Sequence, residues 1–245
     1  MTAAFSAAAK TYDAGAEVQR RVAGSLAQRI KRLSLNAPRV LEIGCGTGLL
    51  SRTLLDLAPR ALVLTDIAPA MIAHCRAALP ENNCTRFVVM DGEAPENVGG
   101  GFDLICSSMT FQWFDDIAAS LPRLAGFLAP GGHLAFATLA AGSFREWRAA
   151  HEALGLSAAT RSYPTADTLR TMLPGLDVGE ENLTQHYADG HSFLAQLKQI
   201  GAHVPKEDRK PLGVGALRRV LRQFADGIDV TYHVAYGMWT SPSVP

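Results

Sequence analysis

Three glycines at alternate positions follow a short apolar stretch early in the chain. Residues 40–43, Val-Leu-Glu-Ile, have the pattern of a buried strand, and Gly44, Gly46 and Gly48 come directly after it. Because glycine has no Cβ, it accepts positive φ and lets a ligand approach the backbone closely, here beside a helix expected to start near Leu49. The spacing therefore predicts a ligand-binding loop.

Dinucleotide-binding folds use a similar loop, so the glycines alone do not identify the ligand. Two details depart from the usual dinucleotide pattern. The third glycine comes two residues after the second rather than three, and Glu42 places an acid inside an apolar strand.

Two later apolar stretches end in acidic residues. Residues 61–66 end in Asp66, about 20 residues past the loop, where a carboxylate can accept both hydroxyl hydrogens of a ribose. Residues 86–91 end in Asp91. The alternative is three ordinary strand ends whose acids only cap helices.

The glycine loop, Asp66 and Asp91, in this order, resemble the class I S-adenosylmethionine-dependent methyltransferases. The resemblance implies that the loop holds the methionine end of S-adenosylmethionine, Asp66 the ribose and Asp91 the adenine amino group. The cofactor-binding residues that it implies are Glu42, Gly44, Cys45, Gly46, Gly48, Asp66, Ile67, Met71, Asp91, Gly92 and Ser107.

Composition narrows the class of protein. The chain has 245 residues, of which 48% are hydrophobic and 19% charged, as expected of a folded protein rather than a disordered one. Lys+Arg and Asp+Glu balance at 23 each, so no net charge points to a nucleic-acid partner. The four cysteines form no C-x-x-C pair, which argues against a metal site and suits the cytoplasm. Neither a secretory signal nor a membrane span is expected.

Strand and helix patterns alternate between residues 36 and 139, which predicts a parallel sheet. We expect an α/β, Rossmann-like class I methyltransferase fold with a mostly parallel seven-stranded sheet in a single domain, 1–245. Residues 1–35 would form an N-terminal helical cap, 36–139 the cofactor-binding core, and 140–245 the substrate-binding helices and final strands. These last residues would include a helical insertion after the fifth strand.

Local patterns predict element boundaries near the fifth strand. We expect a helix over 117–128, a turn over 129–132 and a strand over 133–139. A further helix would begin with a capping box made by Ser143 and Glu146.

Aromatic residues stand at two places that could border a second substrate. The pattern Phe5-x-x-Ala-Ala-x-x-Tyr12 resembles a segment that closes over the cofactor in small-molecule and acyl-group methyltransferases. Gln112 and Trp113 follow the fourth strand, as in methyltransferases that act on trans-aconitate and on malonyl carrier protein. Alternatively, Tyr12 and Trp113 are ordinary packing residues.

The second half of the chain resembles the malonyl-acyl-carrier-protein O-methyltransferases of biotin synthesis. The matching stretches are residues 197–202, the basic stretch 206–210 that follows, and residues 230–237. The resemblance implies methylation of the free carboxylate of malonyl-acyl-carrier protein, or of the corresponding thioester.

Methyl transfer to a carboxylate needs no general base, because the carboxylate is ionised at neutral pH. It needs a cation that selects the carboxylate, and the planar fork of arginine suits two oxygens. Arg145 is the leading candidate and Arg148 the second, so the predicted catalytic set is Tyr12, Trp113 and Arg145. Basic residues that could contact an acidic carrier protein are Lys198, Arg209, Lys210, Arg218, Arg219 and Arg222.

Two other functions stay open from the sequence. One is methylation of a small free polyacid such as trans-aconitate. The other is an assembly or binding protein that keeps the cofactor fold without transferring a methyl group.

Overall fold

The structure is a computed structural model that describes residues 2–80, 82–202 and 212–243. It is organised around a single mixed sheet. The strand order is β3-β2-β1-β4-β5-β7-β6. All neighbouring strands are parallel except β7, which runs antiparallel to both β5 and β6. The strands are β1 (Arg39–Ile43), β2 (Ala61–Asp66), β3 (Thr85–Val89), β4 (Phe102–Ser108), β5 (Leu128–Leu139), β6 (Asp177–Tyr187) and β7 (Ile228–Thr240).

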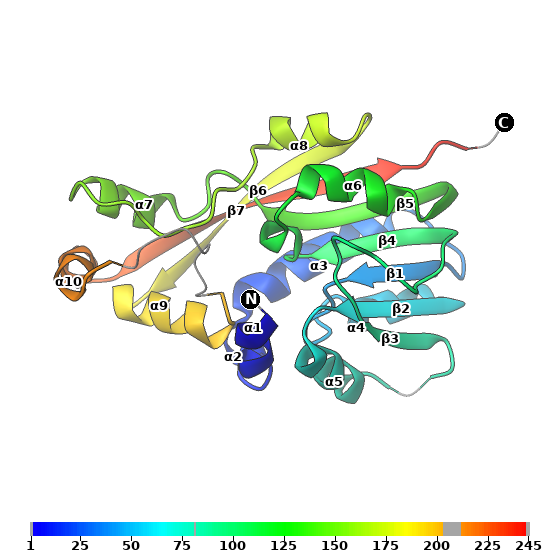
Figure 1. Cartoon of the computed structure of the whole chain (residues 1–245), viewed down its shortest axis with the longest axis horizontal. Helices are drawn as coiled ribbons and strands as arrows, with labels where there is room; N and C mark the ends of the chain where they lie inside the picture. The colour runs from blue at the N-terminus through cyan, green and yellow to red at the C-terminus, as the bar shows by residue number, and fades with distance from the viewer. Residues whose placement is uncertain (1, 81, 203–211, 244–245) are drawn as a thin grey trace.

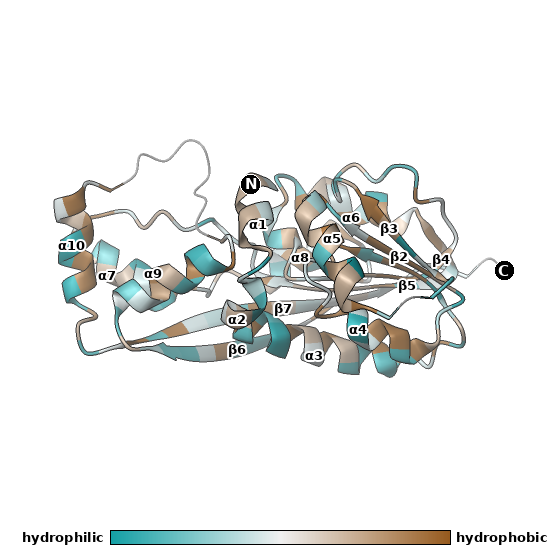
Figure 2. Ribbon diagram, turned by 90° about the horizontal axis from the view of Figure 1, so that it is seen from below, coloured by the Kyte–Doolittle hydropathy of each residue, from teal (hydrophilic) through white to brown (hydrophobic). Residues whose placement is uncertain are grey.

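Helices cover both faces of this sheet; in Figure 2, α3 and α4 lie below it and α6 and α8 above it. Parallel strands need crossover connections. Helices lie between β1 and β2, between β2 and β3, and between β4 and β5, whereas the described segment that joins β3 to β4 contains no helix. The α-helices are α1 (Thr2–Ala8), α2 (Tyr12–Gly15), α3 (Glu17–Lys31), α4 (Ser51–Leu54), α5 (Pro69–Ala78), α6 (Ile117–Ala125), α7 (Arg145–Glu152), α8 (Ala166–Met172), α9 (Gly190–Gln199) and α10 (Val214–Arg222). Two short 3₁₀ helices are η1 (Leu55–Leu57) and η2 (Phe111–Trp113).

Strand alternation divides the core between the two faces of the sheet. Leu62 and Leu64 of β2 point toward the face covered by α3, α4 and α5, whereas Val63 points toward the other face. The fully buried Leu26 and Ile30 of α3 pack in the first of these clusters. The period-two pattern in the strands and the helical pattern in residues 22–30 thus meet in one apolar layer.

The two last strands extend beyond the rest of the sheet (Figure 1). β5 pairs with β7 from His133–Thr240 to Leu139–Val234, and beyond this point β7 continues along β6 to the Ile228–Tyr187 pair. The helices α7, α9 and α10 gather at this extended end. Phe144, Trp147 and Phe193 fill the space there with their rings. The predicted insertion after the fifth strand therefore forms a separate lobe around the β6–β7 extension.

Two predicted boundaries near β5 are wrong. α6 ends at Ala125 rather than residue 128, and residues 129–132 belong to β5 instead of forming a turn before it. The register of β5 against β4 shifts between Phe102 and Leu104. This irregularity lets the Pro-Gly-Gly sequence remain within the strand.

The predicted capping box at α7 is also wrong. The Ser143 hydroxyl donates to the His233 carbonyl oxygen, 2.9 Å away, and Glu146 accepts hydrogen bonds from the backbone N–H and the hydroxyl of Thr231. Both side chains therefore join α7 to β7 rather than cap the helix. In the described part of the chain, no helix has the length and apolar character needed to cross a membrane.

Candidate functional site

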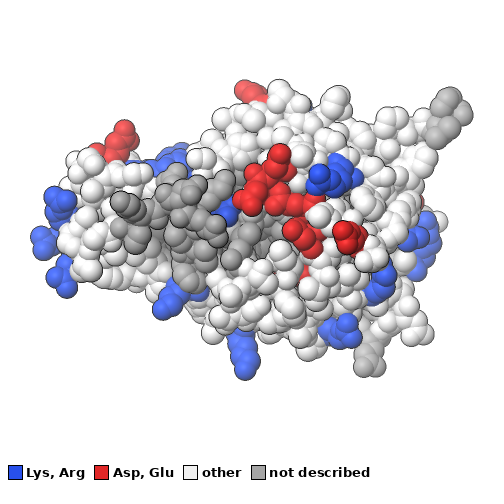
Figure 3. Space-filling view, viewed as in Figure 1, with Lys and Arg blue, Asp and Glu red and all other residues white. Residues whose placement is uncertain are grey.

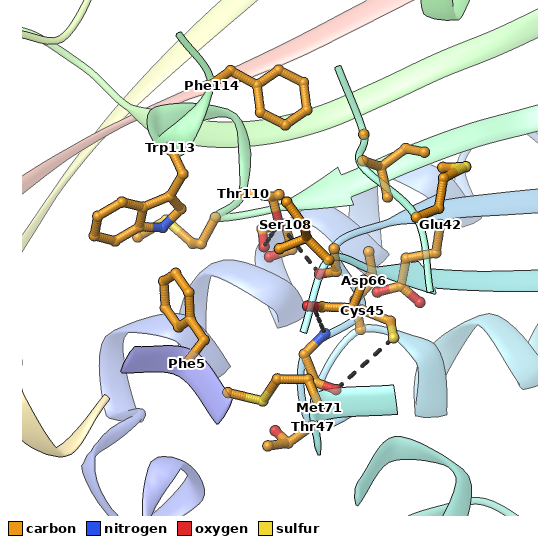
Figure 4. A pocket seen from close by; sticks show the side chains of 18 of the residues that line it. Phe5, Glu42, Cys45, Thr47, Asp66, Met71, Ser108, Thr110, Trp113 and Phe114 are labelled. Atoms are coloured by element: carbon orange, nitrogen blue, oxygen red, sulfur yellow. Dashed lines mark hydrogen bonds between the residues drawn. The ribbon is translucent and has the colours of Figure 1, made fainter. Parts of the chain in front are cut away.

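A cavity of about 240 Å³ lies at the carboxyl ends of β1, β2, β3 and β4 (Figure 4). The carboxyl edge is where ligands bind in open α/β sheets. Among the sequence-predicted cofactor residues, those that line this cavity are Glu42, Gly44, Cys45, Gly46, Asp66, Ile67, Met71, Asp91 and Gly92.

The glycine loop forms one wall of this cavity. Gly44, Gly46 and Gly48 all have positive φ, at 70°, 53° and 90°. A Cβ on Gly44 would overlap the Thr110 side chain, whereas a Cβ on Gly46 would meet nothing within 4 Å. Gly44 is therefore required by both conformation and space, and the open side of Gly46 leaves room for a ligand to approach the backbone.

Asp66 connects this loop to the next helix. Its Oδ2 accepts from the Gly46 backbone N–H at 3.0 Å, and its Oδ1 accepts from the Ala68 N–H at 2.8 Å. Burial raises the pKa of Asp66 above its ordinary value, although these two hydrogen bonds oppose the rise. Because each carboxylate oxygen has two lone pairs, both can still accept from a ligand hydroxyl.

Glu42 is fully buried beneath the loop, with 1% of its surface exposed. Ser51 Oγ donates to its Oε2 at 2.6 Å. Loss of hydration raises the pKa of Glu42 to about 8, because burial disfavours the charged form. A cationic ligand in the cavity would favour the ionised form of this side chain.

The N-terminal segment closes the cavity from one side. Asp13 Oδ1 accepts from the Thr47 hydroxyl of the glycine loop at 2.5 Å, and Arg52 lies 3.7 Å from the same carboxylate. Tyr12 lines the cavity, and its pKa is raised first by burial and then by the nearby Asp66. Asp13 and Thr47 were not predicted from the sequence, because their contact joins residues 34 positions apart.

A second cavity, of about 400 Å³, adjoins the first. Phe5, Tyr12, Gln19, Met109 and Trp113 line both. The rings of Phe5 and Trp113 meet edge to face, 5.2 Å apart, at this shared boundary. The remaining walls of the second cavity come mainly from β5, η2, α7, α9, α10, β7 and the segment between α7 and α8, and they are mainly apolar and aromatic. The extended lobe thus supplies a second binding space directly beside the first.

The two cavities differ in charge. Five acidic residues line the first cavity: Glu42, Asp66, Asp91, Glu93 and Asp115. No described residue lining the second cavity is acidic, and Arg161 is its one arginine or lysine. The first cavity therefore favours a cationic ligand and the second an anionic one.

Of four further predicted site residues, two line both cavities and two line neither. Tyr12 and Trp113 line both cavities, as just described. Gly48 and Ser107 line neither described cavity. Gly48 lies against Cys75, and Ser107 is buried with its hydroxyl bonded to the Ile43 carbonyl oxygen, so the neighbouring Ser108 faces the cavity instead.

The structure does not bring Arg145 to either cavity. Its Nε lies 2.9 Å from Glu146 Oε1, and 60% of its side chain is exposed. Arg148 donates to the Ala141 carbonyl oxygen at 2.7 Å. Because Glu146 is itself held by β7, α7 is oriented so that Arg145 faces away from the second cavity. Arg161 replaces both as the arginine at the cavity.

A family model described as a methyltransferase domain matches residues 18–177. The biotin biosynthesis bifunctional protein BioCD of Bordetella avium is 50% identical over 97% of this chain, which spans only 51% of that protein. The malonyl-[acyl-carrier protein] O-methyltransferase of Magnetococcus marinus is 41% identical over 95% of this chain and 89% of its own length. The chain belongs to this methyltransferase family.

Solved structures support the same fold. A putative methyltransferase from Bacillus halodurans has a TM-score of 0.62 at 14% identity and covers 90% of this chain and 100% of its own. The N-methyltransferase NodS of Bradyrhizobium japonicum, solved with S-adenosyl-L-homocysteine, has a TM-score of 0.50 at 18% identity, covering 89% of this chain and 86% of its own. These likenesses confirm the predicted class I fold. Membership of the methyltransferase family confirms the enzyme class and the cofactor, S-adenosylmethionine.

The residues of the first cavity fit this cofactor. S-adenosylmethionine carries a sulfonium and an ammonium group, and the cavity wall is acidic. Gln19 lines the cavity, and its buried Oε1 has no described hydrogen-bond partner. Glu42, Asp66, Gln19 and the glycine loop are the residues that would hold the methyl donor.

Replacing Asp66 tests the predicted ribose contact of the methyltransferase. Asp66→Ala should weaken S-adenosylhomocysteine binding by about 1–3 kcal/mol, because a charged hydrogen-bond acceptor is lost. Isothermal titration calorimetry measures this, with the exposed Asp177→Asn as a control that keeps full affinity. Unchanged affinity of a folded Asp66→Ala protein would show that the ribose assignment is wrong.

Glu42 should make the cofactor-free methyltransferase less stable as pH rises. Between its unfolded value of 4.5 and its folded pKa of about 8, the folded state keeps a proton that the unfolded state has lost. Stability therefore falls across this window, by at most about 1.4 kcal/mol per pH unit. Glu42→Gln keeps an acceptor for Ser51 and should flatten the slope.

Urea unfolding at several pH values between about 5 and 8 measures the free energy of unfolding across this window. The exposed Glu152→Gln variant is the matched control and should keep the wild-type slope. A Glu42→Gln variant with the same slope as wild type would contradict the assignment of this pH dependence to Glu42.

Proposed function

We propose that this methyltransferase esterifies the free carboxylate of malonyl-acyl-carrier protein. The proposal rests on the different charges of the two cavities. The first cavity, which we assign to the methyl donor and call the donor cavity, has an acidic wall. The second, which we assign to the acceptor and call the acceptor cavity, has no acidic residue among its described lining residues. The relative from Magnetococcus marinus, a malonyl-[acyl-carrier protein] O-methyltransferase, supports the same acceptor.

The reaction needs few groups from the protein. A carboxylate oxygen forms a bond to the methyl carbon of S-adenosylmethionine while the carbon–sulfur bond breaks, and the sulfur keeps the electron pair as a neutral thioether. No proton moves, so no side chain has to act as a base. The protein contributes by orienting the acceptor and excluding water.

The boundary residues of the two cavities are suited to this task. Tyr12 and Trp113 line both cavities, so they border the place where donor and acceptor meet. Phe5 packs against Trp113 and covers the same boundary. In an apolar surrounding, opposite charges attract more strongly than in water, and the transfer consumes both charges. These three aromatic residues would align the reactants and keep the junction dry.

A carrier protein requires a surface as well as a cavity. The exposed Arg218, Arg219 and Arg222 lie on α10, and Leu217 of the same helix lines the second cavity. Figure 3 shows basic side chains at the α10 end of the molecule. These arginines would attract an acidic carrier near the entry to the acceptor cavity. Lys198, on α9, is also exposed. The predicted basic stretch 206–210 lies outside the described residues.

The four cysteines of the chain are free thiols. This is the state expected in a reducing compartment, so we extend the proposal to activity in the cytoplasm.

Transfer of labelled methyl from S-adenosylmethionine tests the proposed reaction. Malonyl-acyl-carrier protein should be labelled, and acetyl-acyl-carrier protein should not, because it lacks the free carboxylate. Label on trans-aconitate alone would keep the chemistry and replace the acceptor. Absence of label on all three, with the cofactor bound, would reject malonyl-carrier methylation and leave the non-methylating alternative to be tested.

Reversing the charge of α10 tests the proposed carrier surface. Arg218→Glu/Arg222→Glu should raise the KM for malonyl-acyl-carrier protein several-fold and leave the KM for malonyl-pantetheine unchanged, because only the protein partner contacts the surface. The effect on the carrier should shrink at high salt. Arg76→Glu/Arg86→Glu, exposed at the β3 side of the sheet, makes the same charge change as a control. Equal effects of the two double variants would contradict the proposed surface.

A further inference from the structure

We infer that Arg161 is the residue that binds the acceptor carboxylate and selects a carboxylate-bearing thioester over an uncharged one. The inference rests on the proposed function and assigns its specificity to one side chain. Arg161 stands between α7 and α8, in a segment without regular structure, and reaches the wall of the second cavity.

The guanidinium of Arg161 is held in place but poorly satisfied. Nη1 donates to the Trp113 carbonyl oxygen at 3.4 Å, a long hydrogen bond, and the guanidinium carbon lies 5.3 Å from the centre of the Trp113 ring. Nε is buried and has no hydrogen-bond partner among the described residues. No described acidic side chain forms an ion pair with Arg161.

Such a group calls for an anion. A buried donor without a partner costs free energy, and a cation without a counter-charge costs more. Nε and Nη2 form the side of the guanidinium that matches the two oxygens of a carboxylate, and neither donates to a described residue. The fork therefore has no described protein partner, and a carboxylate that pairs with both nitrogens requires the side chain to turn its buried Nε toward the cavity.

The surroundings of Arg161 limit what this ligand can be. Apolar and aromatic residues, including Phe144, Leu194 and Leu217, form most of the remaining wall. Tyr163 also lines the cavity, and burial raises its pKa to about 12, so it stays a neutral hydroxyl at neutral pH. The space therefore suits one carboxylate at the end of an otherwise uncharged chain, and it suits a polyanion less well.

Trp113 relates this carboxylate site to the methyl donor. Its ring makes a cation–π contact with the Arg161 guanidinium on the acceptor side, and Trp113 also lines the donor cavity. A carboxylate on Arg161 thus lies next to the boundary between the two cavities. Trp113 contacts the guanidinium and also borders the place of methyl transfer. A carboxylate bound to Arg161 would therefore have its oxygens positioned near the methyl donor.

Binding without turnover tests this inference. With S-adenosylhomocysteine present, calorimetry should show that the wild-type protein binds malonyl-pantetheine roughly tenfold or more tightly than acetyl-pantetheine. Arg161→Met should lose this preference, and Arg161→Lys should keep part of it, because the charge remains without the fork. Arg145→Met, which removes an exposed arginine outside both cavities, should leave the preference intact. Unchanged S-adenosylhomocysteine affinity verifies that each variant is folded.

The outcomes separate this inference from the proposed function. An unchanged malonyl-to-acetyl ratio in folded Arg161→Met would overturn the inference, even if the wild-type protein methylates malonyl-acyl-carrier protein. A lost ratio, together with no methyl transfer from the wild-type protein to that carrier, would support the carboxylate site and reject the proposed acceptor.

Discussion

The two hydrogen bonds accepted by Asp66 are the constraint on which the donor site depends. They fix the Gly46 N–H of the loop after β1 and the Ala68 N–H before α5 to the carboxylate at the end of β2, so two strand ends and the start of α5 share a common geometry. The loop in turn receives Asp13 through the Thr47 hydroxyl, which attaches the N-terminal segment. The glycine loop, the end of β2 and the N-terminal segment are therefore joined by a few directional contacts around buried carboxylates.

Burial of acids in the donor cavity is costly without a cationic ligand. Glu42 illustrates this, since its raised pKa means that the empty site favours the protonated side chain. A cationic methyl donor supplies the missing counter-charge. The acceptor cavity shows the opposite imbalance, with the Arg161 guanidinium lacking a described acidic partner. Each cavity is thus completed by the charge of its own reactant, and in methyl transfer to a carboxylate these two charges cancel.

The sequence predicted the parts of the site that are local in the chain. The strand, the glycine loop and Asp66 follow one another within thirty residues, and their roles in the fold depend on conformations that the residue types themselves favour. The prediction that Ser107 lines the cofactor cavity was wrong because successive residues of a strand point to opposite faces of the sheet. The prediction that Arg145 faces the substrate was wrong because its neighbour Glu146 is held by Thr231, 85 positions away in the chain. Arg161 was missed because its segment has no periodicity and reaches the cavity only through tertiary packing.

The relative placement of the two cavities follows from a shared strand. The part of β7 paired with β5 belongs to the main sheet, and its continuation carries Tyr232 into the wall of the acceptor cavity. A continuous, hydrogen-bonded strand varies little in length or direction, so it sets the spacing of the lobes more precisely than a loop does. The N-terminal segment and the segment with Arg161, which also border the cavities, lie outside this frame. The fold thus keeps the distance between donor and acceptor in the sheet and leaves acceptor selection to side chains attached around it.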